Sequence, residues 1–225
     1  MTAVRRSPNI PSMTGSYETL LERLQAYATR NGLDDARLAR EEFHRRTGEF
    51  VEGEPWYELR MNMFLDYYLL DRPSPSGETP AEAFLAEHGG ALTPAERPAF
   101  AHLTVTLRTA FRLTRIHGAQ LELDDLGGGG RWRALWTLPS IGLAVGDIVD
   151  TRIVLVDGVP TTGRCAVLHP REAHEAIAKI VARARAVGMP PRDLVDHLDK
   201  MRLKLDRYSN VRIRHVYQYP DDAIM

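Results

Sequence analysis

The sequence predicts an α+β protein: an N-terminal helical bundle, a small five-stranded β-barrel of the SH3 or OB kind, and closing helices at the C-terminus. Two observations carry this prediction. Apolar residues recur at helical spacing before about residue 107 and after about residue 168, whereas they alternate between these points. Glycine and aspartate separate the alternating stretches, as is usual in tight turns between strands.

These changes of pattern also divide the chain. The predicted segments are a flexible tail at 1–15, a helical domain at 16–107, a small β-barrel at 108–168, closing helices at 169–208, and a C-terminal strand or tail at 209–225.

In the helical domain, the first helix begins after Ser16 and ends at Asn31-Gly32, and the second begins at Asp34 or Asp35. The third segment, PWYELRMNMFLDYYLLD at 55–71, is apolar on all sides. A helix of that kind is buried, so we expect it to form the spine of this half.

The letters TPAE occur twice, at 79–82 and at 93–96, after the loop sequence PSPSGE. Threonine, proline and glutamate at this spacing form a capping box, in which the threonine and glutamate side chains satisfy free backbone N–H groups. We therefore predict two short helices, at about 80–88 and 94–106.

Alternation predicts five strands, at about 108–116, 119–124, 131–137, 147–156 and 161–168. Four glycines at 127–130 raise the possibility of a phosphate-binding loop, which would have to lead into a helix. Instead, Trp132, Ala134 and Trp136 alternate with arginines, which is typical of a strand. The glycines are therefore predicted to form a hairpin turn.

After His169-Pro170 the helical pattern returns, and Gly188-Met189-Pro190-Pro191 interrupts it. The last helix carries an apolar seam, which we expect to pack on the protein's own body. The seam consists of Leu194, Leu198, Met201, Leu205 and Tyr208.

Composition limits the possible functions. The chain has 225 residues and a formal net charge of -1, so no global field attracts it to nucleic acid or to a membrane. No apolar run approaches the ~20 residues of a membrane span. The N-terminus has no apolar stretch after Arg5 and Arg6 and does not read as a secretory signal, so we expect a cytoplasmic protein.

No catalytic, cofactor-binding or metal-binding residue is predicted. Glu41 and His44 have the spacing of a di-iron ligand pair, but no second such pair occurs. His169 and His174 are expected to serve as capping and surface residues, and Cys165 to behave as a small apolar residue in a strand. An enzyme of unrecognised type remains a third hypothesis.

The leading hypothesis is a non-enzymatic adaptor or regulatory scaffold that binds another protein, possibly a second copy of itself. Its predicted contact surface is the basic, tyrosine-rich C-terminus, because tyrosine and arginine are enriched at interface hot spots. The candidate residues are Tyr208, Arg212, Arg214, Tyr217 and Tyr219.

The alternative hypothesis is a nucleic-acid-binding module that uses a basic face of the barrel, as OB-type folds do. This face would consist of Arg131, Arg133, Arg152 and Arg164. Nearby carboxylates favour an ion-paired surface instead: Glu122, Asp124, Asp125, Asp147 and Asp150.

About half the chain, residues 57–168, resembles a family of uncharacterised bacterial proteins, some of which carry a SEC-C zinc tail. The resemblance lies in FLDYYLLDRP, SGETPAEAFL, LTPAER, LDDL and VGDIVDTRIV. It implies a helical segment followed by a small β-rich module, and it carries no activity. The cysteines of the zinc tail are absent from this chain.

Overall fold

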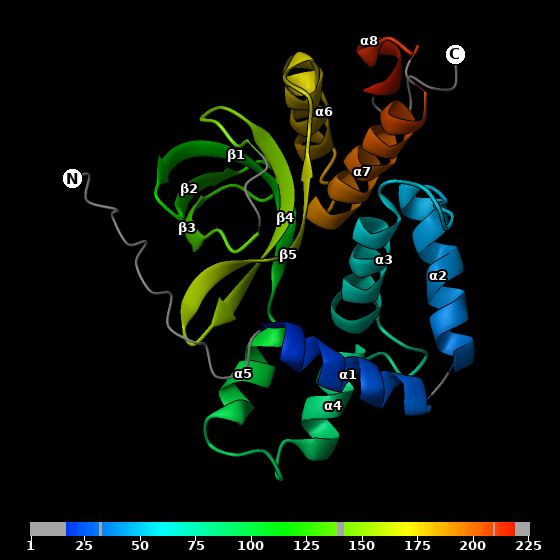
Figure 1. Ribbon diagram of the computed structural model, residues 1–225, viewed down its shortest axis with the longest axis vertical. Helices are drawn as coiled ribbons and strands as arrows, with labels where there is room; N and C mark the ends of the chain where they lie inside the picture. The colour runs from blue at the N-terminus through cyan, green and yellow to red at the C-terminus, as the bar shows by residue number, and fades with distance from the viewer. Residues whose placement is uncertain (1–16, 32, 139–141, 209, 219–225) are drawn as a thin grey trace, which may run out of the picture.

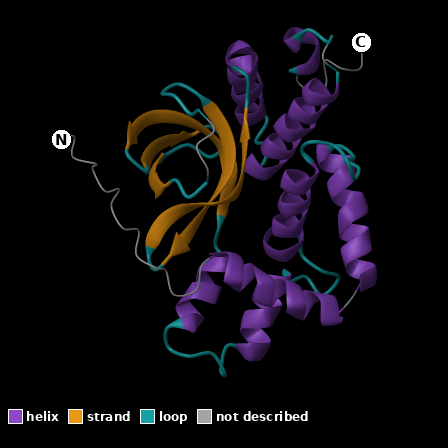
Figure 2. Cartoon of the chain, in the orientation of Figure 1, coloured by secondary structure: helices purple, strands orange, loops and turns teal. Residues whose placement is uncertain are grey.

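The computed structural model describes residues 17–31, 33–138, 142–208 and 210–218. The fold is α+β, with the strands gathered in one body and helices flanking it (Figures 1 and 2). The helices before the strands are α1 (Tyr17–Asn31), α2 (Leu33–Thr47), α3 (Tyr57–Asp66), the π-helix η1 (Tyr67–Asp71), α4 (Pro80–His88) and α5 (Glu96–Leu103). Those after the strands are the 3-10 helix η2 (Arg171–Ala173), α6 (His174–Ala186), α7 (Pro191–Arg207) and α8 (Ile213–Val216).

The sheet is mixed and its strand order is cyclic. The strands are β1 (Leu107–His117), β2 (Gln120–Asp125), β3 (Arg131–Leu135), β4 (Ile148–Val156) and β5 (Val159–Leu168). They pair in the order β1-β2-β3-β5-β4, and β4 pairs back with β1. All pairings are antiparallel except that of β3 with β5, which join in parallel at Leu135 and Thr161. All five predicted strands are therefore confirmed, and no strand end differs from its predicted position by more than two residues.

Apolar side chains form three cores. The first lies among α1 to α5 and the outer face of β4 and β5, where it includes Val154 and Val167. The second packs α6, α7 and α8 on Ala110 and Ile148. The third fills the inside of the sheet around Phe111. Alternating positions of β4 thus face different cores, so the strand is buried at nearly every residue.

The helical predictions are mostly confirmed, with three corrections. The segment 55–71 is buried as expected, but its last turn is the π-helix η1. The second TPAE forms its capping hydrogen bonds, yet α5 begins only at Glu96 and ends at Leu103. The C-terminal segment forms the single helical turn α8 where alternation had suggested a strand. The predicted tail at 1–15 lies outside the described residues.

Helices from before the sheet in the chain contact both the sheet and a helix that follows it. The two sets of helices therefore do not form separate groups. Helix α2 contacts α7, α3 contacts β5 and α5 contacts β4. The α7 seam packs on the protein's own body, as expected, with the exception of Tyr208, which is exposed. Within the described part of the chain, no helix combines the length and the apolar character needed to cross a bilayer.

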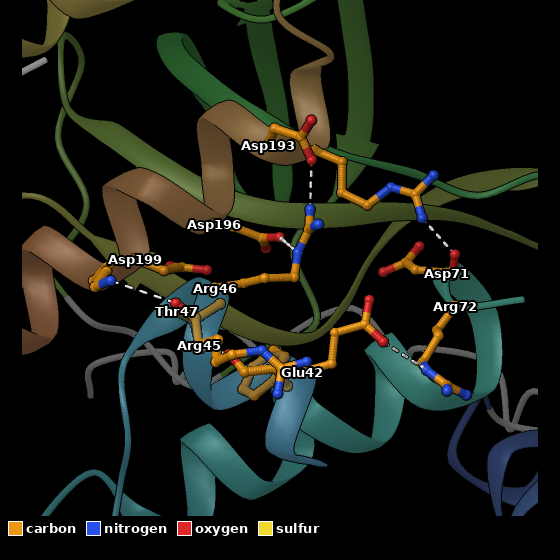
Figure 3. Close-up of polar contacts among 12 residues, drawn as sticks. Glu42, Arg45, Arg46, Thr47, Asp71, Arg72, Asp193, Asp196 and Asp199 are labelled. Atoms are coloured by element: carbon orange, nitrogen blue, oxygen red, sulfur yellow. Dashed lines mark hydrogen bonds and ion pairs between the residues drawn. The ribbon is translucent and has the colours of Figure 1, made fainter. Parts of the chain in front are cut away.

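Charged side chains, most of them ion-paired, lie where the helices meet the sheet. We call this cluster the charged junction and define it by Arg46, Arg60, Asp71, Arg108, Arg152, Asp193, Asp196 and Asp199. Figure 3 shows Asp193 and Asp196 of α7 pointing toward Arg46 of α2. Arg108 of β1 donates to Asp196 at 2.6 Å and to Asp199 at 2.7 Å. Ion pairs therefore join α2 and β1 to α7.

Arg152 and Asp71 form the pair that joins the sheet to η1. The guanidinium of Arg152 donates to both carboxylate oxygens of Asp71, and also to Thr106 Oγ1 at 2.5 Å. The Arg152 side chain is only 4% exposed and that of Asp71 11%. Burial opposes ionisation of Asp71, but the neighbouring Arg152 outweighs it and lowers the pKa of this carboxyl.

We expect Arg152→Met to lower the free energy of unfolding by about 3–5 kcal/mol, because it leaves the Asp71 carboxylate buried without its partner. The double variant with Asp71→Asn should lose clearly less than the sum of the two single variants. Urea denaturation measures all three. The matched control is Arg131→Met, whose exposed pair with Asp124 should change stability little. Additive losses would show that the two side chains do not depend on each other.

The glycine run forms the turn between β2 and β3, as predicted. Asp125 Oδ1 accepts hydrogen bonds from the N–H groups of Gly127 at 2.8 Å and Gly128 at 3.1 Å, so these groups are not available to a phosphate. Gly129 and Gly130 have φ of 81° and 118°, which glycine adopts without strain. A Cβ on Gly127 would lie 2.8 Å from Cβ of Pro191. The turn therefore needs glycine partly because α7 begins against it.

We expect Gly127→Ala to destabilise the protein by about 1–3 kcal/mol, because its methyl group would overlap Thr109 and Pro191. Gly90→Ala is the control, since a Cβ there meets nothing within 4 Å. Thermal unfolding of both variants provides the comparison. Equal melting temperatures would show that the contact with α7 does not constrain the turn.

Candidate functional site

The four arginines of the nucleic-acid hypothesis do not form one exposed face. Each has a carboxylate partner: Arg131 with Asp124, Arg133 with Glu122, Arg152 with Asp71 and Arg164 with Asp66. Arg131 and Arg133 are exposed on β3, whereas Arg152 is buried and Arg164 half-buried. The expectation of an ion-paired surface is confirmed for the two on β3.

The remaining acidic residues named with them have other partners. Asp125 holds the glycine turn, Asp147 pairs with Arg171 at 2.8 Å, and Asp150 binds His169 at 2.7 Å.

The candidate residues at the C-terminus are divided between surface and interior. Tyr208, Arg212 and Arg214 are exposed. Tyr217 is only 3% exposed, because it packs inward in the core beneath α8. It therefore cannot reach a partner at this surface. Tyr219 lies outside the described residues.

Tyr217 belongs to a buried chain of hydrogen bonds that the sequence did not predict. Its hydroxyl lies 2.8 Å from Nδ1 of His169, whose Nε2 lies 2.7 Å from Asp150 Oδ2. His169 is 1% exposed, so its expected surface role was wrong. Burial raises the pKa of the Tyr217 hydroxyl. A carboxylate, an imidazole and a hydroxyl in line suggest a proton relay. Their burial, however, leaves no place for a substrate. These hydrogen bonds instead attach the segment that follows α8 to the sheet.

The structure also places Cys165, His174 and the pair Glu41 and His44. The Cys165 side chain packs against the first core, and His174 is half-buried. Nowhere in the part of the chain that the structure describes do three or more His, Cys, Asp or Glu residues gather to hold a metal ion, and this includes Glu41 and His44.

A concave site lies among α1, α2, η1, α4 and the loop at 72–79. We call it the Tyr68 groove. It has a volume of about 410 Å³, within the usual range for ligand pockets. Its lining consists of Tyr27, Ala28, Asp35, Tyr68, Ser74, Pro75, Ser76, Glu78, Pro80 and Ala83. Apolar and aromatic groups therefore dominate it, with a few polar groups among them.

Local sequence explains how the groove is built. The turn at 74–77 closes with Gly77 N–H donating to Ser74 O at 2.9 Å, and Gly77 has a φ of 92°. Thr79 and Glu82 then form the predicted capping box, which fixes the start of α4. The loop is thus held at both ends and forms one wall of the groove.

Arg72 sets the opposite wall. It donates to Asp35 Oδ1 and to Glu42 Oε2, each at 2.9 Å, so it joins the end of η1 to α2 (Figure 3 for Glu42). Its own charge is neutralised by these two carboxylates. The π-helix before it ends with Arg72 N–H donating to Tyr67 O, and this wide turn also carries Tyr68.

Three polar groups of the groove have no hydrogen-bond partner among the described residues. They are the Tyr68 hydroxyl, Asp35 Oδ2 and the Glu78 carboxylate. Tyr68 as a whole is only 7% exposed, and its ring stacks on Phe64 at 6.3 Å. Burial raises the pKa of the Tyr68 hydroxyl, and the negative charge of Asp35 raises it further. Tyr68 thus presents its hydroxyl at the wall of the groove, although most of the residue is buried.

Comparison of the chain with protein-family models, curated proteins and solved structures found no match in any of the three.

The groove was not predicted from the sequence. The sequence did predict its loop and its capping box. It assigned Tyr68 to the buried spine, and Tyr68 does lie in that core. Only the contact of α2 with η1 brings Asp35 beside Tyr68, so no local pattern reveals the site.

We expect the Cys165 thiol to react with a disulfide reagent at least roughly tenfold more slowly in the folded protein than in denaturant. Burial raises the pKa of this thiol, and nearby Asp66 raises it further, so little thiolate forms near neutral pH. Absorbance of the released thiolate measures the rate. Equal rates in both states would show that Cys165 is an accessible thiol, and the enzyme hypothesis would regain a nucleophile.

Proposed function

We propose that this protein is a non-enzymatic adaptor or regulatory scaffold that binds another protein, with the Tyr68 groove as the contact site. The observation that carries the proposal is the groove itself: a pocket of about 410 Å³ lined by two tyrosines, two prolines and two carboxylates. Tyrosine-lined pockets of this kind anchor side chains at protein interfaces.

Binding fits the groove better than catalysis does. Its lining has no cysteine, histidine or lysine, and the hydroxyls of Ser74 and Ser76 bond to each other at 2.7 Å instead of to a base. Tyr208, Arg212 and Arg214 supply a further exposed surface that a partner can contact. We place the site on the helical side and keep these three residues as a secondary contact.

The type of β-sheet and the cellular location are part of the same proposal. We infer that the five-stranded sheet is a small barrel of the SH3 or OB kind, and that the protein works in the cytoplasm. The resemblance of residues 57–168 to the bacterial family stays a prediction, and it transfers no activity.

We expect immobilised full-length protein to retain a partner from nuclease-treated lysate of the source organism, and Ala83→Trp to lose it. The indole would fill the groove, because Ala83 lies in its wall. Mass spectrometry of the retained proteins provides the measurement. Ala86→Trp is the matched control: it places the same side chain at an exposed position of α4 outside the groove lining.

The comparison of variants decides between hypotheses. Retention of the same partner by both variants would reject the groove, and loss on truncation after residue 207 would then favour the C-terminal contact. Retention that requires intact nucleic acid and falls steeply with salt would instead support the nucleic-acid hypothesis, with Arg131 and Arg133 as its exposed arginines.

A further inference from the structure

The charges that line the Tyr68 groove are of one sign. Asp35 and Glu78 are its only charged lining residues, and both are carboxylates. Glu78 is exposed and has no ion-pair partner among the described residues. A cation that enters the groove therefore meets an uncompensated negative charge, whereas an anion would be repelled.

The nearest arginine does not cancel this charge. Arg72 carries one positive charge and is shared between Asp35 and Glu42, at 2.9 Å from each. Arg72 therefore offsets the charge of Asp35 only in part, and Glu78 in the loop has no ion-pair partner among the described residues. Asp35 Oδ2 stays without a hydrogen-bond partner in the described chain, so it can accept from a second donor.

The aromatic residues complete a site for a cation. Tyr27 and Tyr68 both line the groove, and tyrosine rings attract Lys and Arg through their π faces. The Tyr68 hydroxyl has an acceptor lone pair for an N–H donor, while most of the residue is buried at the wall of the groove. The hydroxyl-bearing Tyr68 and the two carboxylate-bearing residues thus line the same mostly apolar pocket.

We propose that the Tyr68 groove binds a cationic side chain, an arginine or a lysine, presented by the partner protein. This inference rests on the proposed function and specifies the chemistry of the same site. The alkyl stem of the partner residue packs on Ala83, Pro80 and the tyrosine rings. Its charged end reaches Asp35 Oδ2, the Tyr68 hydroxyl and Glu78. An acidic or purely apolar partner segment leaves these acceptors unsatisfied.

The test uses small probes and the full-length protein. Nα-acetyl-arginine amide, Nα-acetyl-lysine amide and the neutral isostere Nα-acetyl-citrulline amide are titrated to millimolar concentration. Amide chemical shifts in two-dimensional NMR report where each probe binds. We expect saturable shifts around residues 72–83 with the two cationic probes, and roughly tenfold weaker binding of the citrulline probe.

Variants link the effect to the two carboxylates. Glu78→Gln should weaken the cationic probes about threefold, as expected for one exposed charge. Asp35→Asn should weaken them at least as much. Glu52→Gln is the matched control, because Glu52 is an equally exposed carboxylate in the loop between α2 and α3 and does not line the groove. It should leave binding unchanged.

Several outcomes would overturn the inference: no shifts in the groove with either cationic probe, equal binding of the citrulline probe, or no loss in the Glu78 and Asp35 variants. The two proposals fail separately. If Ala83→Trp abolishes partner retention but the cationic probes do not bind, the groove is an interface of other chemistry. If the probes bind and no protein is retained through the groove, the cation site stands and the adaptor proposal fails.

Discussion

Asp71 and Arg152 lie between the helices and the sheet with little access to water, and neither charge is tolerable there without the other. The Arg152 guanidinium donates hydrogen bonds to both carboxylate oxygens of Asp71, so the end of η1 has a fixed position and direction on β4. Arg72 follows directly in the chain, and its two ion pairs then place α2. The Tyr68 groove is a consequence, since its walls are η1, α2 and the loop that begins at Arg72.

The charged junction explains how separate apolar cores are assembled in one arrangement. Apolar contacts between helices are nearly interchangeable, whereas a bidentate arginine accepts one geometry. Arg108 on β1 and Arg46 on α2 both bind carboxylates of α7, so this helix is fixed to the sheet and to the first half of the chain. We interpret the ion pairs as setting the positions of these elements, while the cores supply most of the stability.

The β3 surface and the Tyr68 groove differ in whether their polar groups have partners within the protein. On β3 the exposed arginines are matched by carboxylates of β2, so that surface needs no partner. At the Tyr68 groove, Arg72 binds Asp35 Oδ1 and Glu42, whereas Asp35 Oδ2 and the Tyr68 hydroxyl have no hydrogen-bond partner among the described residues. Acceptor groups therefore predominate at the groove, which is the basis of the proposal that it receives a cationic side chain.

The sequence by itself determined the α+β class, the five strands, the capping box at Thr79 and the turn at 127–130, because periodicity, capping and glycine conformation act over a few residues. Only the tertiary structure decided that Arg152 is buried, that His169 binds Tyr217, and that Asp35 lies beside Tyr68. These outcomes depend on pairs far apart in the chain. An arginine or a tyrosine has the same local pattern whether its partner is water or a buried carboxylate, so packing alone distinguishes the two.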